Sequence, residues 1–270
     1  MFDTFINSFK LRNTYKVNTI IYSIKQLPII KKILPESLYQ NKVLKIIGNI
    51  ISIIMEILLI FLGKFIYIIT MIFGVLSLYK TKQSDTFLHL LLFLSIIGAF
   101  LNTYMFNPTR DKYYAMFIMR MNAKEYTITN YLYSILKVII GFMPFTIVFG
   151  LIANVNIFIC ILIPFYIASV KIIVGAYSLL EYEKKKIIIN ENKPVKYIWI
   201  LTAFLLILAY GLPYIGIVIN QTIFITIALI FIILAIYGIK YINKFNSYRE
   251  LYKIMLTSGD INVTTNSQDI

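Results

Sequence analysis

Six long apolar runs dominate the chain between residues 46 and 242, and polar segments separate them. A helix rises about 1.5 Å per residue, so roughly 20 apolar residues cross the hydrocarbon core of a bilayer. The runs reach this length, and they predict an all-α, polytopic membrane protein with six transmembrane helices. We place the spans at about residues 57–79, 87–106, 128–153, 157–180, 198–219 and 222–242.

The first apolar run, residues 46–79, is longer than one span needs. It forms either two short spans that meet at Gly63 and Lys64 or one span with an interfacial extension. Two residues are too few to reverse a helix pair in the headgroup region, so we favour one span with Glu56 near the cytoplasmic surface. The third and fourth spans are joined only by the tripeptide that starts at Asn154, which predicts a tight hairpin.

The segments outside the spans differ from them in composition. Residues 1–45 contain eight Lys and Arg residues. Apolar side chains recur there at helical spacing, which predicts an amphipathic helix in the headgroup plane. Residues 46–242 form the transmembrane domain, and residues 243–270 form a cytoplasmic tail that we expect to be partly disordered. The apolar positions of the N-terminal stripe are Val17, Ile20, Ile21, Ile24 and Leu27.

Composition and charge agree with a membrane protein and give its orientation. The chain is 59% hydrophobic and 14% charged, and its mean hydropathy is +0.79. The net charge of +14 comes with no nucleic-acid-binding motif, so we expect no nucleic acid as a partner. Of the 26 Lys and Arg residues, 21 fall in segments that share a side with the N-terminus, and only Lys80 and Lys82 lie in the other loops. Loops rich in Lys and Arg stay in the cytoplasm. We therefore expect a protein of the plasma membrane with both termini in the cytoplasm.

The segment of residues 107–132, between the second and third spans, combines basic, acidic and aromatic side chains. It is too polar to cross a bilayer and too apolar for a loose loop. We interpret it as a short amphipathic helix at the cytoplasmic end of the bundle, followed by a turn.

This segment resembles the corresponding region of ABC-transporter permeases of the ABC-2 kind. Residues 110–112, Arg-Asp-Lys, resemble the charged cluster of that family, residues 115–119 its short apolar helix and residues 121–126 its polar turn. The six spans and the N-terminal interfacial helix are also similar, and the layout resembles the first six-span half of a larger bacterial exporter permease. The resemblance implies a permease subunit that pairs with a second permease bundle and with ABC ATPase subunits.

The chain has no phosphate-binding loop of the form G-x-x-x-x-G-K-[ST], so ATP would be bound by a separate ATPase chain. Given the resemblance, the apolar side chains of the segment would seat in a groove of the ATPase, and the basic ones would lie at its rim. A simpler interpretation is that the aromatic rings only hold the loop at headgroup level. The residues expected at the ATPase contact are Arg110, Lys112, Tyr113, Tyr114, Met116, Phe117 and Arg120.

Two lysines lie within the third and fourth spans. Lys137 and Lys171 each lie about nine residues from the cytoplasmic ends of their spans, roughly 13 Å deep. Intramembrane charge indicates function by default, so these lysines are candidates for a cavity that takes an anionic or amphipathic substrate. Alternatively, both side chains extend back to the interface.

Chemistry in this chain is not expected. Of the 12 acidic residues, only Glu56 is near the interior of a span, whereas membrane enzymes need clustered Asp, Glu or His. His89 stands alone, which favours an interfacial or hydrogen-bonded histidine over a metal ligand. Cys160 has no partner for a disulfide. We therefore predict no catalytic residue, cofactor or metal site.

The leading hypothesis is a permease subunit that exports a hydrophobic or amphipathic substrate such as a peptide or lipid. The alternative is a membrane immunity or assembly factor that binds another membrane protein and transports nothing. Composition does not separate the two.

Overall fold

The computed structural model describes residues 2–25, 42–103, 105–106, 109–186 and 195–257. Within these ranges the chain is helical and contains no strand. The elements are α1 (Phe2–Lys25), α3 (Lys42–Met71), the 3-10 helix η2 (Phe73–Leu78), α4 (Gln83–Leu101), α5 (Arg110–Tyr113), the π-helical turn η3 (Tyr114–Ile118), α6 (Ala123–Ile152), α7 (Ile157–Lys185), α8 (Lys196–Tyr214), α9 (Gln221–Lys244) and α10 (Tyr248–Thr257).

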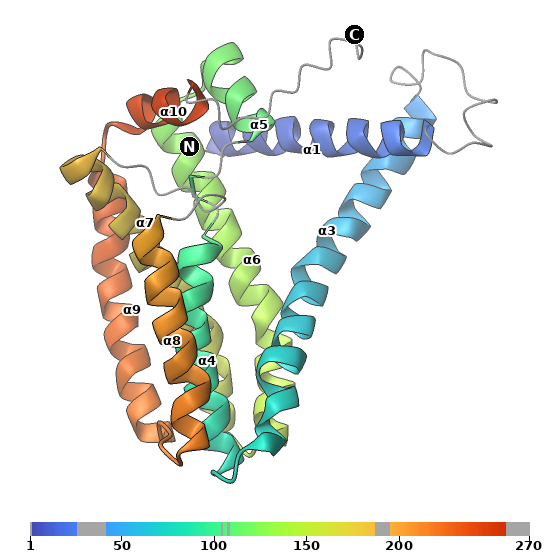
Figure 1. The fold of residues 1–270 in the computed structure, drawn as a ribbon. Helices are drawn as coiled ribbons and strands as arrows, with labels where there is room; N and C mark the ends of the chain where they lie inside the picture. The colour runs from blue at the N-terminus through green and yellow to red at the C-terminus, as the bar shows by residue number, and fades with distance from the viewer. Residues whose placement is uncertain (1, 26–41, 104, 107–108, 187–194, 258–270) are drawn as a thin grey trace.

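Six of these helices are long and apolar enough to cross a membrane, as the apolar runs predict. They are α3 with η2, α4, α6, α7, α8 and α9. Several extend beyond the predicted spans, because a helix continues past the point where its side chains cease to be apolar. The successive spans alternate in direction, so α1 and α10 lie at the same end of the bundle (Figure 1). We call it the α1 end.

The first apolar run forms one continuous helix and not two short spans. It begins at Lys42, well before the predicted start at about residue 57. Gly63 lies inside α3 with open space around its Cα, so nothing there turns the chain. Gly48 serves a different purpose, because a Cβ at this position would lie 2.9 Å from Cγ1 of Val17 on α1. The additional helical turns of α3 therefore provide the surface on which α1 packs.

The core of the bundle surrounds α4 and α7, which are the most buried of the six spans. A larger apolar cluster fills the bundle away from the α1 end, and a second one lies where α6, α7, α9 and α10 meet. The predicted hairpin between α6 and α7 is present. Asn154 adopts a left-handed φ of 61°, and the Asn156 side chain accepts a hydrogen bond from the Phe158 amide at 2.9 Å to cap α7.

Helix α3 leans away from the other spans toward the α1 end, and α1 runs across the top of the resulting wedge (Figure 1). Near the opposite end α3 crosses α6 closely: a Cβ on Gly141 would lie 2.6 Å from the carbonyl oxygen of Ile60. Val17 and Ile21 of α1 are buried against Leu44 of α3. Part of the apolar stripe predicted to face lipid therefore packs on protein. The side chains of Ile24 and Leu27 lie outside the described residues.

The segment predicted as a tail contains a packed helix. Tyr248, Leu251, Tyr252, Met255 and Leu256 of α10 are buried in the second apolar cluster. The Thr127 hydroxyl of α6 donates a hydrogen bond to the Tyr252 hydroxyl at 3.0 Å. The disorder predicted beyond residue 257 concerns positions outside the described residues.

Candidate functional site

The polar segment between α4 and α6 folds as a short helical hairpin at the α1 end. We call its described part, residues 109–122, the coupling segment. Helix α5 continues into η3, and Arg120 then adopts a left-handed φ of 48°, which ends the helix. The Met121 amide donates to the Ala115 carbonyl at 2.9 Å and closes this turn. The turn comes earlier than predicted, because α6 already begins at Ala123.

The start of α6 is fixed by a side-chain cap. The Asn122 side chain accepts a hydrogen bond from the backbone amide of Glu125 at 3.2 Å. An amide side chain at this position satisfies one of the helix donors that have no partner in the first turn. The coupling segment is therefore joined to the third span by a rigid turn.

The candidate contact residues of the coupling segment separate into two faces. Tyr113, Tyr114 and Phe117 remain between 37 and 41% exposed. Met116 is only 7% exposed and packs into the second apolar cluster. The exposed face thus presents three aromatic rings, whereas Met116 anchors the segment to the bundle.

The basic residues of the segment also differ in their surroundings. Arg110 and Arg120 are exposed, and Lys112 donates a hydrogen bond from Nζ to the carbonyl oxygen of Met105 at 3.3 Å. The ring of Phe117 lies 5.0 Å from that of Tyr113, between centroids. Two of the three predicted cations are consequently available at the rim of the aromatic face.

The coupling segment touches α1 through a pair of tyrosines. The ring centroids of Tyr114 and Tyr15 are 5.4 Å apart in an edge-to-face arrangement. Burial, together with the neighbouring Tyr114 hydroxyl, raises the pKa of Tyr15 above that of a free tyrosine. The Tyr15 hydroxyl therefore stays protonated at physiological pH.

Glu56 of α3 lies at the centre of a charged junction that joins three helices. Its Oε2 is 3.0 Å from Nζ of Lys16 on α1, and its Oε1 is 3.3 Å from Nζ of Lys137 on α6. The Tyr133 hydroxyl of α6 donates to Oε1 at 2.9 Å. The Lys137 ammonium also lies 4.6 Å from the centroid of the Tyr133 ring. We call Lys16, Glu56, Tyr133 and Lys137 the Glu56 junction.

Lys137 and Lys171 have separate partners. Lys171 is buried, and its Nζ donates to the backbone carbonyl of Asn102, just after the last residue of α4. Lys137 instead faces α3. Adjacent helices therefore carry the two lysines at similar depth, but the side chains point to different neighbours.

His89 is buried inside the bundle and is hydrogen-bonded, one of the two arrangements expected from sequence. Its Nε2 lies 3.1 Å from the Leu208 carbonyl oxygen of α8, and its ring packs on Phe93. Its Nδ1 has no hydrogen-bond partner among the described residues. No group of three or more His, Cys, Asp or Glu side chains suited to a metal occurs in the part of the chain that the structure describes.

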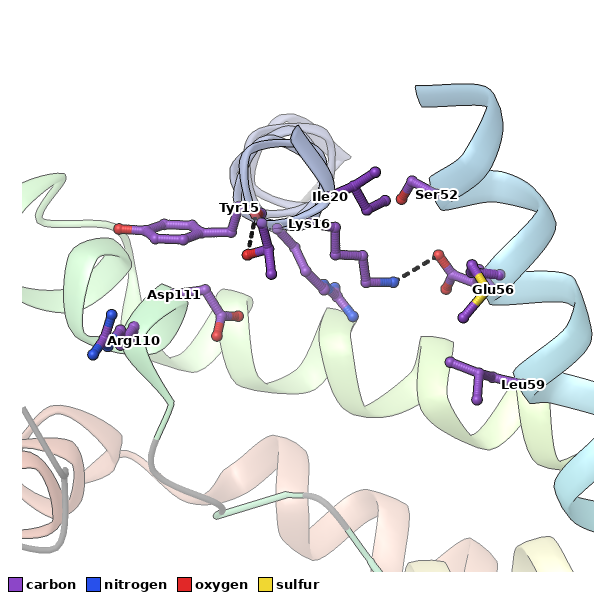
Figure 2. Close-up of a pocket in the computed structure, with 11 residues that line it drawn as sticks. Tyr15, Lys16, Ile20, Ser52, Glu56, Leu59, Arg110 and Asp111 are labelled. Carbon is purple, nitrogen blue, oxygen red and sulfur yellow. Dashed lines mark hydrogen bonds and ion pairs between the residues drawn. The ribbon is translucent and has the colours of Figure 1, made fainter. Parts of the chain in front are cut away.

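A pocket of about 440 Å³ lies beneath α1, between α3 and the coupling segment (Figure 2). Lys16 and Glu56 meet at one side of it, and Arg110 and Asp111 lie at the other. Ile20, Met55 and Leu59 supply apolar lining, and the rest of the wall comes from Arg12, Tyr15, Thr19 and Ser52. Neither Lys137 nor Lys171 lines this pocket.

The Glu56 junction is the main feature that sequence reasoning did not assemble. Glu56 stands out in the sequence as an acid beside an apolar run, and a carboxylate in such a position needs a cationic partner. The sequence offers several lysines as partners, however, and its spacing does not say which of them lies near Glu56. The partners come from α1 and α6, which only the fold brings together.

Comparisons with known proteins add no relative. No protein-family model, curated protein or solved structure matches this chain.

Proposed function

We propose that this protein is the permease subunit of an ATP-driven ABC exporter. The observation that carries the proposal is the coupling segment, which presents Tyr113, Tyr114 and Phe117 outward while its other face is anchored in the bundle. An exposed aromatic patch with a basic rim is the kind of surface that seats in a groove of a partner protein. The six helices suited to span a membrane provide the path for the substrate.

In this proposal the α1 end faces the cytoplasm. Lys and Arg residues are concentrated in the segments at that end, and the loop between η2 and α4 at the opposite end carries only Lys80 and Lys82. Short loops rich in Lys and Arg remain in the cytoplasm of the plasma membrane, where a soluble ATPase is found.

The coupling segment has two routes for transmitting a displacement. The turn at Arg120 and the cap at Asn122 connect it rigidly to α6. The contact between Tyr114 and Tyr15 connects it to α1, and the Glu56 junction connects α1 to α3. A push on the exposed rings thus moves α1 and α6, and the Glu56 junction passes the displacement to α3, a rigid-body change of the kind that opens and closes a transport path.

In this proposal the ATPase and the permease have separate roles. ATP is bound and hydrolysed by the partner ATPase, and this chain performs no catalysis. A second permease bundle, either another copy or a related chain, completes the transporter. The exported substrate is hydrophobic or amphipathic, such as a peptide or a lipid.

The test is copurification of an ABC ATPase from native membranes with the tagged full-length chain. We expect the ATPase to be recovered with the wild type and to be lost from the double variant Tyr113→Ala/Phe117→Ala, because both rings are removed from the exposed face. Tyr22→Ala is the matched control, since Tyr22 is an exposed aromatic residue of α1 outside the segment. Undiminished recovery with the double variant would contradict the proposed contact.

A second result separates the transporter from an immunity or assembly factor. The membrane complex should hydrolyse ATP, and the copurified subunit should contain a phosphate-binding loop. A stable complex with another membrane protein and no ATPase would overturn the proposal in favour of that alternative.

A further inference from the structure

The pocket beneath α1 has an excess of positive charge. Arg12, Lys16 and Arg110 line it, together with the two carboxylates of Glu56 and Asp111. Glu56 is already paired with two lysines: Lys16, which lines the pocket, and Lys137 of α6, which does not. The four cations around the pocket therefore outnumber its two carboxylates.

Much of the cationic hydrogen-bonding capacity is still open. The guanidinium of Arg110 forms no hydrogen bond or ion pair within the described part of the chain; it lies at the pocket edge and is turned away from Glu56 (Figure 2). Arg12 uses one nitrogen to reach the Asn130 side chain, and a guanidinium carries five N–H donors. A guanidinium that lines a pocket suits an anion with several oxygen atoms, such as a phosphate, and the charge of Arg110 at the pocket edge adds to the attraction.

The apolar wall of the pocket continues down α3. Met55 and Leu59 line the pocket, and Leu62 and Ile66 follow at intervals of three and four residues, so the four side chains share one helix face. Each of them is between 48 and 64% exposed. We call these four residues the α3 stripe. It is about 16 Å long at the helical rise, roughly half the hydrocarbon thickness of a bilayer.

We propose that the pocket binds the headgroup of an anionic phospholipid, with one acyl chain lying along the α3 stripe. The phosphate accepts hydrogen bonds from Arg12, and Lys16 and Arg110 add positive charge. The acyl chain covers an exposed apolar face that extends for one leaflet. A free phosphate ion would use the cations but leave the stripe without a role, so the continuity of pocket and stripe favours the lipid.

Native mass spectrometry of the purified full chain tests the charge requirement. The wild type should bind phosphatidylglycerol at least fivefold more tightly than phosphatidylcholine with the same acyl chains. Arg110→Gln should reduce that preference about fivefold, which corresponds to about 1 kcal/mol for one basic residue near the surface. Arg249→Gln is the control, because Arg249 is an exposed arginine of α10 that does not line the pocket. Equal binding of both lipids by the wild type, or equal losses in the two variants, would overturn the proposal.

A second pair of variants tests the acyl chain. Leu59→Asn should weaken phosphatidylglycerol binding severalfold, whereas Ile57→Asn should not, since Ile57 is also exposed, at 51%, but lies on another face of α3 and does not line the pocket. Inorganic phosphate at the lipid concentration should not displace the lipid. Displacement of the lipid by phosphate, or unchanged phosphatidylglycerol binding in Leu59→Asn, would indicate a phosphate site and contradict the lipid assignment.

The lipid site shares Arg110 with the expected ATPase contact and Lys16 with the Glu56 junction, but the two proposals are tested at different residues. The ATPase contact is tested at Tyr113 and Phe117, neither of which lines the pocket. Either experiment can therefore fail while the other succeeds.

Discussion

Removal of the Glu56 charge should loosen α1 from the rest of the molecule. Glu56 is 19% exposed at its side chain and contacts two ammonium groups and one hydroxyl. The variant Glu56→Gln keeps the shape but leaves Lys16 and Lys137 facing each other with no negative charge between them. Breaking a fully buried pair costs about 3–5 kcal/mol, and surface pairs contribute about 0–1 kcal/mol. Because the junction is partly buried, we expect a value between these two, a loss of about 2 kcal/mol in the free energy of unfolding.

The two ion pairs should contribute unequally. The Lys16 side chain is the more exposed partner, so water screens its contact with Glu56 more effectively. A double-mutant cycle of Glu56→Gln with Lys16→Met should give a coupling energy of about 0.5 kcal/mol. The cycle with Lys137→Met should give about 1–2 kcal/mol, because this contact is more buried and is supported by the Tyr133 ring.

The measurement is equilibrium unfolding of the purified chain in mixed detergent micelles, combined with hydrogen exchange of the α1 amides. Glu250→Gln on α10 is the matched control, because Glu250 is exposed and its substitution should change the unfolding free energy by less than about 0.5 kcal/mol. The α1 amides should exchange faster in Glu56→Gln and not in the control. A coupling energy near zero in the Lys16 cycle, or unchanged exchange of the α1 amides in Glu56→Gln, would refute the reasoning that the junction holds α1.

Two further predictions use backbone geometry and the same unfolding assay. Gly141→Ala should destabilise the chain by about 1–3 kcal/mol, since the new Cβ meets the Ile60 carbonyl at 2.6 Å, whereas Gly63→Ala should stabilise it by about 0.5–1 kcal/mol because nothing lies within 4 Å. Equal effects of the two alanines would contradict the close crossing of α3 and α6. Asn122→Ala should cost about 1 kcal/mol and speed exchange of the Glu125 amide, and unchanged exchange would count against the cap.

The sequence predicts the six helices suited to span a membrane well, because the length of each apolar run can be compared with the thickness of the hydrocarbon core. It predicts the helix ends less well. Helical hydrogen bonds continue beyond the hydrocarbon, and α3 begins fifteen residues before the predicted start at residue 57, in the part on which α1 packs. The start of α6 was recoverable, because Asn122 followed by Glu125 is a capping pattern.

Helix α10 was also recoverable from the sequence. Its buried residues start at Tyr248 and recur at intervals of three, four, seven and eight positions, which is the spacing of one helix face. The partners of Lys137 and Lys171 were not recoverable. Connectivity places the two lysines on neighbouring helices at similar depth, but the rotation of each helix about its axis decides what a side chain faces, and only packing fixes that rotation.

The contacts of α1 bear on how this helix would act in a transporter. Thr4, Ser8, Arg12 and Lys16 recur every four residues, so they share one face, and each donates a hydrogen bond to a side chain or carbonyl. Three of these bonds reach α6 or α3. Breaking one of these bonds costs only about 1 kcal/mol net, because water replaces the lost partner. Each buried apolar side chain contributes about 1.5–3 kcal/mol. Helix α1 combines these bonds with only two buried apolar side chains, Val17 and Ile21, so it separates from its neighbours more readily than α4 or α7, which form the core of the bundle. The motion that the proposed function requires therefore falls on an element that is held less firmly than the core helices.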